Sequence, residues 1–145
     1  MENLWRLLEW FGLFLGVVIA GLLAAFLFLR ARILRRVQAE LGREALLIST
    51  AARVREYDHA ADRASSSART GILMLLASGL YFHSWFGSRE VFVSGPSISW
   101  IGVSDARIVV RFLNAAGKED GISIALLYPE QWVAAIKTHL ITRAG

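Results

Sequence analysis

The sequence contains no cysteine, and this absence removes several classes of chemistry. Disulfide bonds, thiolate metal sites, iron–sulfur clusters and cysteine nucleophiles are all excluded, and the redox compartment is left undetermined. No catalytic motif stands out either. Ser65, Ser66 and Ser67 precede Arg69 without a partner base or a nucleophile elbow, so they indicate a turn.

Metal-binding patterns are also missing. His59, His83 and His139 lie in three different predicted elements and form no i,i+4 pair, so they do not predict a metal site. We therefore expect no cofactor, no metal and no enzymatic activity.

Charge is absent from residues 10–29, WFGLFLGVVIAGLLAAFLFL, a run of 20 residues. At about 1.5 Å per residue this run makes a helix about 30 Å long, which matches the hydrocarbon thickness of a bilayer. No small-residue cleavage site separates it from the following RARILRR. The sequence therefore predicts an uncleaved transmembrane anchor over residues 1–29 and a basic juxtamembrane helix over residues 30–42.

The positive charge is concentrated beside this run. The net charge is +4, and residues 30–43 alone hold five arginines and one glutamate. Residues 44–145 are nearly balanced, so nucleic acid is not an expected partner. The positive-inside rule places the carboxy-terminal part in the cytoplasm, behind a single span of the cell membrane. The arginines expected to contact lipid head groups are Arg30, Arg32, Arg35 and Arg36.

Small residues recur at every fourth position of the apolar run. Gly12, Gly16, Ala20 and Ala24 fall along one helical stripe, where another membrane helix can approach closely. Glycine and alanine are also common in membrane helices without such packing, so both interpretations stay open.

A second uncharged stretch, GILMLLASGLYFHSWFG, covers residues 71–87. Its length is at the lower limit for a spanning helix, and Gly79 in its middle suits a turn better than a helix. We predict two adjacent strands here, with a second transmembrane span as the structural alternative.

The pattern after Gly42 is that of a β domain over residues 43–145. Strand-like segments are separated by turn signals, and RIVVRFL and ISIALL flank NAAGKEDG as a hairpin. The chain then ends in an amphipathic helix, YPEQWVAAIKTHL, with Pro129 at its first position.

This order of elements resembles the pleckstrin-homology (PH) superfold, and within it GRAM-type and bacterial PH-like domains. REALLISTAARV resembles the opening strand, GILMLL and LYF the following strand pair, and PEQWVAAI the closing helix. Ala77 departs from the usual threonine, and Gly95-Pro96 resembles an insertion. The resemblance implies a mainly β chain: an antiparallel PH-like β-barrel closed by the helix, with Trp132, Val133 and Ile136 as the barrel plug.

PH-like domains generally bind phosphoinositides, peptides or proteins rather than catalyse reactions. The resemblance implies a ligand site near the first strand, and the candidate residues are Arg53, Arg55, Arg63 and Arg69. Interspersed acidic residues also fit a solvated strand edge. Six aromatic residues are expected in the core rather than on a stacking surface: Tyr81, Phe82, Trp85, Phe86, Phe92 and Trp100. Trp85-Phe86 as an exposed tip is the minority interpretation.

The sequence thus predicts a membrane-anchored, non-catalytic binding or scaffold module with membrane lipids and a protein as partners. The alternative is an accessory subunit of a membrane transporter or enzyme, held by the small-residue stripe.

Overall fold

The first element is a long helix. The computed structural model describes residues 2–58, 63–64 and 67–141, and in it α1 (Glu2–Leu41) is one continuous helix of 40 residues. The prediction that the helix continues beyond the apolar run into the arginine-rich segment is confirmed. Among the described residues, α1 is the one helix that is long and apolar enough to cross a membrane. Length and composition therefore permit a single span.

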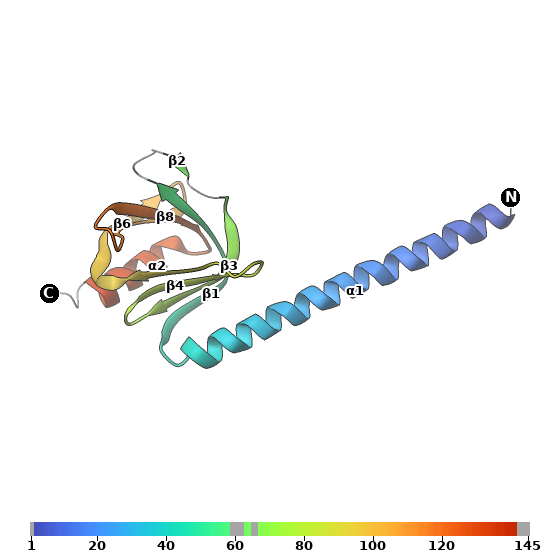
Figure 1. The fold of residues 1–145 in the computed structure, drawn as a ribbon, viewed down its shortest axis with the longest axis horizontal. Helices are drawn as coiled ribbons and strands as arrows, with labels where there is room; N and C mark the ends of the chain where they lie inside the picture. Colours follow the sequence, from blue (N-terminus) through green and yellow to red (C-terminus); the bar gives the residue numbers. More distant parts are fainter. Residues whose placement is uncertain (1, 59–62, 65–66, 142–145) are drawn as a thin grey trace. The chain divides into compact units, whose positions relative to one another are not determined.

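The chain divides into two compact units, Met1–Glu40 and Leu41–Gly145. The second unit holds an antiparallel sheet with the strand order β5-β4-β3-β1-β8-β7-β6, and β2 pairs with β1 beside this path (Figure 1). The strands are β1 (Ala45–Asp58), β2 (Arg63–Ala64), β3 (Arg69–Leu76), β4 (Gly79–Ser84), β5 (Glu90–Ser94), β6 (Ile98–Ser104), β7 (Arg107–Leu113) and β8 (Glu119–Ala125).

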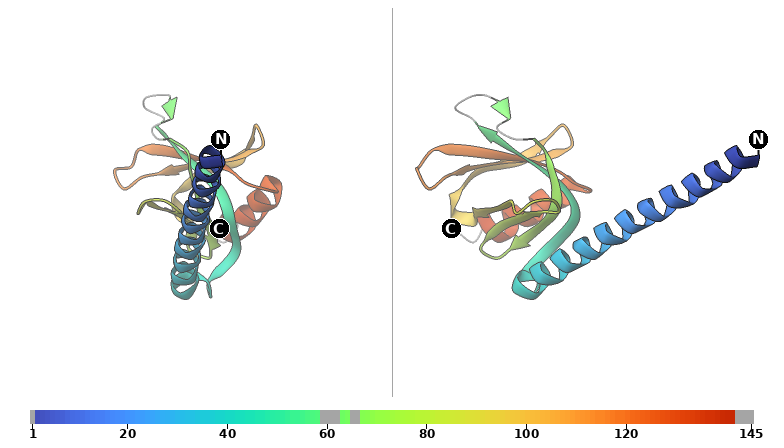
Figure 2. Two further views of the ribbon diagram at one scale, coloured as in Figure 1. Left: turned by 90° about the vertical axis from the view of Figure 1, so that its right-hand side faces the viewer. Right: turned by 45° about the vertical axis from the view of Figure 1, so that its right-hand side comes forward.

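Strand β1 joins two halves of the sheet. It pairs with β3 from Ala45 to Val54 and with β8 from Arg53 to Tyr57. Irregularities between Ala45 and Leu47, and between Ser49 and Ala52, interrupt the β1–β3 register, and such bulges bend a strand. Figure 2 shows β1 passing from one half of the sheet to the other. The sheet therefore folds over on itself.

The expected closed barrel is not confirmed, because the described edge strands β5 and β6 do not pair with each other. A short 3₁₀ helix, η1 (Gly95–Ser97), connects these strands. Pro96 within it fixes its own φ angle and has no N–H to donate to a ladder. The chain passes through η1 from one end of the strand order to the other without pairing β5 with β6.

The uncharged stretch 71–87 forms most of the β3–β4 hairpin, so the prediction of two strands is confirmed. Ala77 and Ser78 make the turn, and Gly79 opens β4. A Cβ atom on Gly79 would lie 2.2 Å from the Val93 carbonyl oxygen of β5. Only glycine fits that close approach of two backbones.

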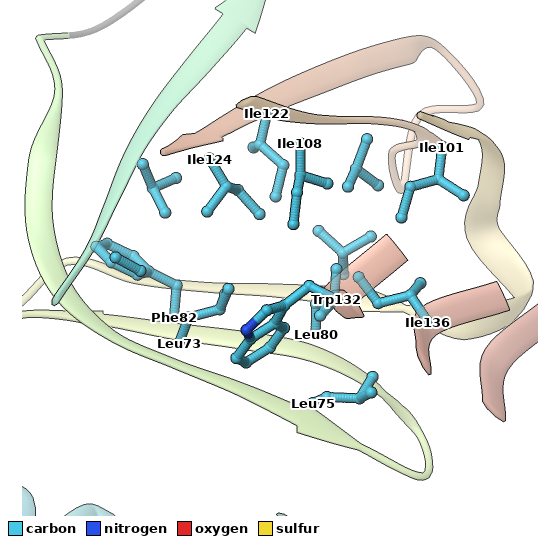
Figure 3. Packing of buried hydrophobic residues seen from close by; sticks show 14 of the residues in the cluster. Leu73, Leu75, Leu80, Phe82, Ile101, Ile108, Ile122, Ile124, Trp132 and Ile136 are labelled. Atoms are coloured by element: carbon cyan, nitrogen blue, oxygen red, sulfur yellow. The ribbon is translucent and has the colours of Figure 1, made fainter. Parts of the chain in front are cut away.

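Helix α2 (Pro129–Ile136) continues into one π-helical turn, η2 (Lys137–Ile141). Pro129 stands in the first turn, as predicted, and Tyr128 before it is left-handed with a φ of 57°. Figure 3 shows Trp132 and Ile136 between the core residues of the two sheet halves. The helix thus fills the space that the folded sheet leaves between its halves.

Candidate functional site

A groove of about 380 Å³ lies on the outer face of strands β1, β8, β7 and β6. In these strands Val54, Ile108, Val110, Ile122 and Ile124 face the core. Because successive side chains of a strand alternate between its faces, the residues between them lie on the outer face. The outer-face residues that line the groove are Tyr57, Trp100, Ser104, Val109, Arg111, Gly121 and Ser123, and the core-facing Ile122 also contributes to the lining.

Strand pairing places the main side chains of the groove in one row. Tyr57 of β1 is opposite Gly121 of β8, Gly121 is opposite Arg111 of β7, and Arg111 is opposite Trp100 of β6. Gly121 has no side chain, so a gap remains between Tyr57 and Arg111. The groove therefore has its floor at Gly121, with Tyr57 on one side and Arg111 and Trp100 on the other.

Trp100 lies along its own strand. A Cβ atom on Gly102 would be 2.6 Å from the Trp100 ring, so the ring covers that glycine. The Arg111 guanidinium carbon is 5.3 Å from the ring centroid, which is a cation–π contact. The side chain is nevertheless 47% exposed. A rigid aromatic surface is therefore available to a ligand.

Four arginines share this outer face. Arg53 and Arg55 alternate with the core residues of β1, and Arg107 and Arg111 do so in β7. The ion pairs of the described residues are Arg36–Glu40, His83–Glu90 and Arg89–Glu56, and they include none of these four. The Nε atom of Arg55 is buried without a hydrogen-bond partner. None of the four is therefore in an ion pair with a described carboxylate, although Glu119 of β8 lies on the same face, two residues from Gly121.

The four arginines expected at the ligand site are not all brought together. Arg53 and Arg55 lie on the outer face, and Arg55 is opposite Ser123 of the groove. Arg69 is opposite Val54, which faces the core, so it points to the other side of the sheet. Arg63 lies in β2, and its side chain is outside the described part of the chain.

The expectation that six aromatic residues lie in the core is wrong for three of them. Phe82 and Trp85 are buried, and the Trp85 Nε1–H donates to the Thr50 carbonyl oxygen at 3.0 Å. Tyr81 is half-buried. Phe86, Phe92 and Trp100 are 66%, 52% and 47% exposed. Phe92 and Trp100 adjoin Val93 and Ile101, which occupy the inward positions of their strands.

Sequence reasoning missed Arg111. The signal is present in RIVVRFL, where Arg107, Val109 and Arg111 alternate with Ile108 and Val110. Such alternation predicts one buried and one exposed face, but it does not say which strand lies beside this one. Only the pairing of β7 with β6 brings Arg111 to Trp100.

The histidines lie apart. His83 in β4 has its Nε2 atom 3.6 Å from Glu90 and its Nδ1 atom 2.7 Å from the Ser84 carbonyl oxygen, and His139 lies in η2. His59 is outside the described residues. Within residues 2–58, 63–64 and 67–141, no three histidine, aspartate or glutamate side chains are grouped to hold a metal ion.

The other predicted residues lie in the two helices. Arg30, Arg32, Arg35 and Arg36 are in the last 12 residues of α1, and the Nε atom of Arg36 is 3.2 Å from Glu40. Trp132, Val133 and Ile136 of α2 are 6%, 8% and 0% exposed. The small-residue stripe is exposed at each of its members, Gly12, Gly16, Ala20 and Ala24.

Comparisons with known proteins yield a fold but no family. No family model matches the chain, and no curated protein matches it. Among solved structures, the crystal structure of Dcp1p is 12% identical, with a TM-score of 0.51, over 67% of this chain and 83% of that one. A chain of the 8S snRNP assembly intermediate is 10% identical, with a TM-score of 0.52, over 68% of this chain and 80% of that one.

A third similar structure is the C-terminal domain of an unknown protein from Leishmania infantum. It is 15% identical, with a TM-score of 0.49, over 77% of this chain and 97% of that one. Together with the seven-strand path and the closing helix, the likeness to Dcp1p supports a PH-like or EVH1-type fold.

Proposed function

We propose that this chain is a membrane-anchored, non-catalytic binding module that holds a protein partner in the outer-face groove. The observation that carries the proposal is the groove itself. It combines an exposed tryptophan, a tyrosine and Arg111, which is in no ion pair with a described residue, and tryptophan, tyrosine and arginine are enriched among the residues that carry binding energy in protein interfaces. Its volume is within the usual range for ligand clefts. The resemblance to PH-like domains, which generally bind ligands rather than catalyse reactions, supports this role.

The helix would supply the location. If α1 spans the bilayer, the arginines that follow its apolar run keep the second unit in the cytoplasm and contact anionic head groups. Anchoring then raises the effective concentration of the module near membrane-bound partners. Within the PH-like superfold we favour a GRAM-type, bacterial-type domain, on the strand pattern of residues 71–82 and the closing helix.

Topology is tested with reporters fused after Gly145 and inserted within residues 58–68. Both are expected to be active only in their cytoplasmic form. Opposite sides for the two reporters would contradict a single span, and a periplasmic or extracellular result for both would contradict the orientation.

A second candidate function is an accessory subunit of a membrane transporter or enzyme. The exposed stripe of Gly12, Gly16, Ala20 and Ala24 favours it, because no described atom lies within 4 Å of a Cβ added at either glycine. A bulky side chain there would block a partner helix and leave the chain's own fold unaffected.

Co-purification in mild detergent separates the two candidates. With a binding module, Trp100→Ala is expected to release the partner, and Gly12→Leu with Gly16→Leu is expected to retain it. With an accessory subunit, Trp100→Ala is expected to retain the partner, and Gly12→Leu with Gly16→Leu is expected to release it. If both variants retain the full set of co-purifying proteins, neither surface binds a stable partner.

A further inference from the structure

We propose that the outer-face groove binds an extended acidic peptide segment of the partner protein, with Arg111 in the groove and Arg55 beside it each receiving one carboxylate. The inference rests on the proposed function, which gives the groove a protein ligand, and it specifies the chemistry of that ligand.

Arg55 has a buried donor without a partner, and Arg111 is exposed at the groove. The buried Nε atom of Arg55 has no hydrogen-bond partner. Arg111 contacts the Trp100 ring, but a ring supplies no oxygen to accept its N–H groups. Neither arginine is in an ion pair of the described residues. Because a guanidinium presents a planar fork of donors that matches a carboxylate, each is prepared for a charge-assisted, bidentate hydrogen bond.

The spacing of the arginines favours a chain-like ligand over one small anion. Arg55 is on β1 and Arg111 is on β7, with β8 between them, and their partners Ser123 and Gly121 are two residues apart. Two strand spacings and two residue rises separate their Cα atoms by roughly 12 Å. An extended peptide spans that distance in about four residues, so two of its acidic side chains can meet both arginines.

The remaining lining of the groove points to a peptide rather than a phosphorylated lipid. Tyr57, Val109 and Trp100 give apolar and aromatic walls, and the floor is made by Gly121 and Ser123. A head group would pair with the arginines and leave those walls uncovered, whereas apolar side chains between the acidic ones cover them. The cluster expected for a head group is also divided, because Arg69 points to the opposite side of the sheet.

The test is a selection from a displayed library of random peptides, with the full chain held in uncharged detergent micelles. The wild-type chain is expected to enrich peptides rich in aspartate and glutamate. The double variant Arg55→Gln/Arg111→Gln is expected to lose that enrichment. A matched control, Arg43→Gln/Arg69→Gln, removes the same charge from exposed positions outside the groove and is expected to retain it.

A selected peptide is then measured by fluorescence anisotropy. Arg55→Gln and Arg111→Gln are each expected to weaken binding about tenfold, since each removes a charge-assisted hydrogen bond. Replacing the glutamates of the peptide by glutamine is expected to have the same effect, and added salt is expected to weaken binding further. Circular dichroism checks that each variant is folded. If Arg111→Gln is not folded, the affinity of Arg55→Gln for the peptide is the test of the inference.

The outcomes separate this inference from the proposed function. The wild-type chain could select a pool of peptides that is not enriched in acidic residues and that Trp100→Ala no longer binds. This result would overturn the acidic ligand, and the groove would still be a protein-binding site. Failure to select any pool above empty micelles overturns both. Mixed micelles with phosphatidylinositol phosphate that bind this site more tightly than the selected peptide also overturn the inference, because the ligand is then a lipid.

Discussion

Helix α1 and the β domain (residues 43–145) contain the same types of apolar side chain, but these are exposed in α1 and buried in the β domain. Leu22 and Phe28 of α1 are 68% and 72% exposed, whereas Leu80 and Phe82 of β4 are 1% and 2% exposed. A helix that is apolar on all sides needs a nonaqueous environment, since it has no polar face to leave in water. The β domain instead supplies that environment from its own two sheet halves and α2.

A similar contrast exists within the β domain, between the two faces of strands β6, β7 and β8. The inner face carries isoleucine and valine and is buried. The outer face carries Trp100, Arg107 and Arg111, and the groove is there. Burial stabilises the fold through the inner face. It does not explain why an exposed tryptophan contacts Arg111, which is in no ion pair with a described residue. The outer face is therefore the proposed binding surface.

The largest expected effect separates the two faces of the β domain. Trp132→Ala is expected to lower the free energy of unfolding of a fragment of residues 43–145 by about 3 to 5 kcal/mol, because it removes a large buried side chain from between the sheet halves. Trp100→Ala, the matched control on the outer face, is expected to cost less than about 1 kcal/mol. Urea unfolding measures both. Equal midpoints for the two variants would contradict the contrast, as would a mainly helical circular dichroism spectrum.

The next largest expected effect is on the membrane insertion of α1. Ile19→Arg places a charge in the middle of the apolar run and is expected to reduce membrane insertion by about 2.5 to 3.5 kcal/mol. Ser99→Arg, at an exposed position of β6, is expected to leave insertion unchanged. Alkaline extraction of membranes compares the two variants. If the wild-type chain is itself extracted as a soluble protein, α1 is not an anchor.

Glycine has different roles in the two units. A Cβ atom on Gly71 would lie 2.0 Å from the His83 carbonyl oxygen, and one on Gly12 would meet nothing within 4 Å. Gly71→Ala is therefore expected to lower the free energy of unfolding by about 2 kcal/mol, whereas Gly12→Ala is expected to leave it unchanged. Thermal unfolding of the full chain in detergent provides the measurement. A neutral Gly71→Ala would mean that β3 and β4 are not so closely paired.

The smallest effect per residue is electrostatic. A peptide of residues 30–43 is expected to bind anionic vesicles, with about 1 kcal/mol for each arginine near the surface, and salt is expected to release it. A fragment of residues 44–145, with a net charge of +1, is expected to bind these vesicles hardly at all. Selective binding of one phosphorylated lipid by that fragment, lost in Arg53→Ala/Arg55→Ala, would move the lipid contact from the juxtamembrane arginines to the groove.

Much of the fold could be predicted from the sequence because its signals are local. The helical extent of α1, the strand pair within residues 71–87 and the start of α2 at Pro129 follow from length, periodicity and turn residues. The predicted closure of the barrel is not confirmed: β5 and β6 are separated in sequence by η1 alone and do not pair, and the local pattern of a strand does not specify its neighbour. Half of the predicted ligand arginines, Arg53 and Arg55, lie beside the groove, and Arg69 does not, because its strand position places it on the other face.

By itself, the sequence determined the apolar helix, the basic segment after it, and the alternation that gives each strand an inner and an outer face. These depend on the composition and order of neighbouring residues. Only the tertiary structure decided which outer faces meet. Strands β1, β8, β7 and β6 bring Tyr57, Gly121, Arg111 and Trp100 into one row, although Tyr57 and Gly121 are far apart along the chain. The physical reason is that the groove depends on strand pairing and register, which are set by burial of the opposite face rather than by the groove residues themselves.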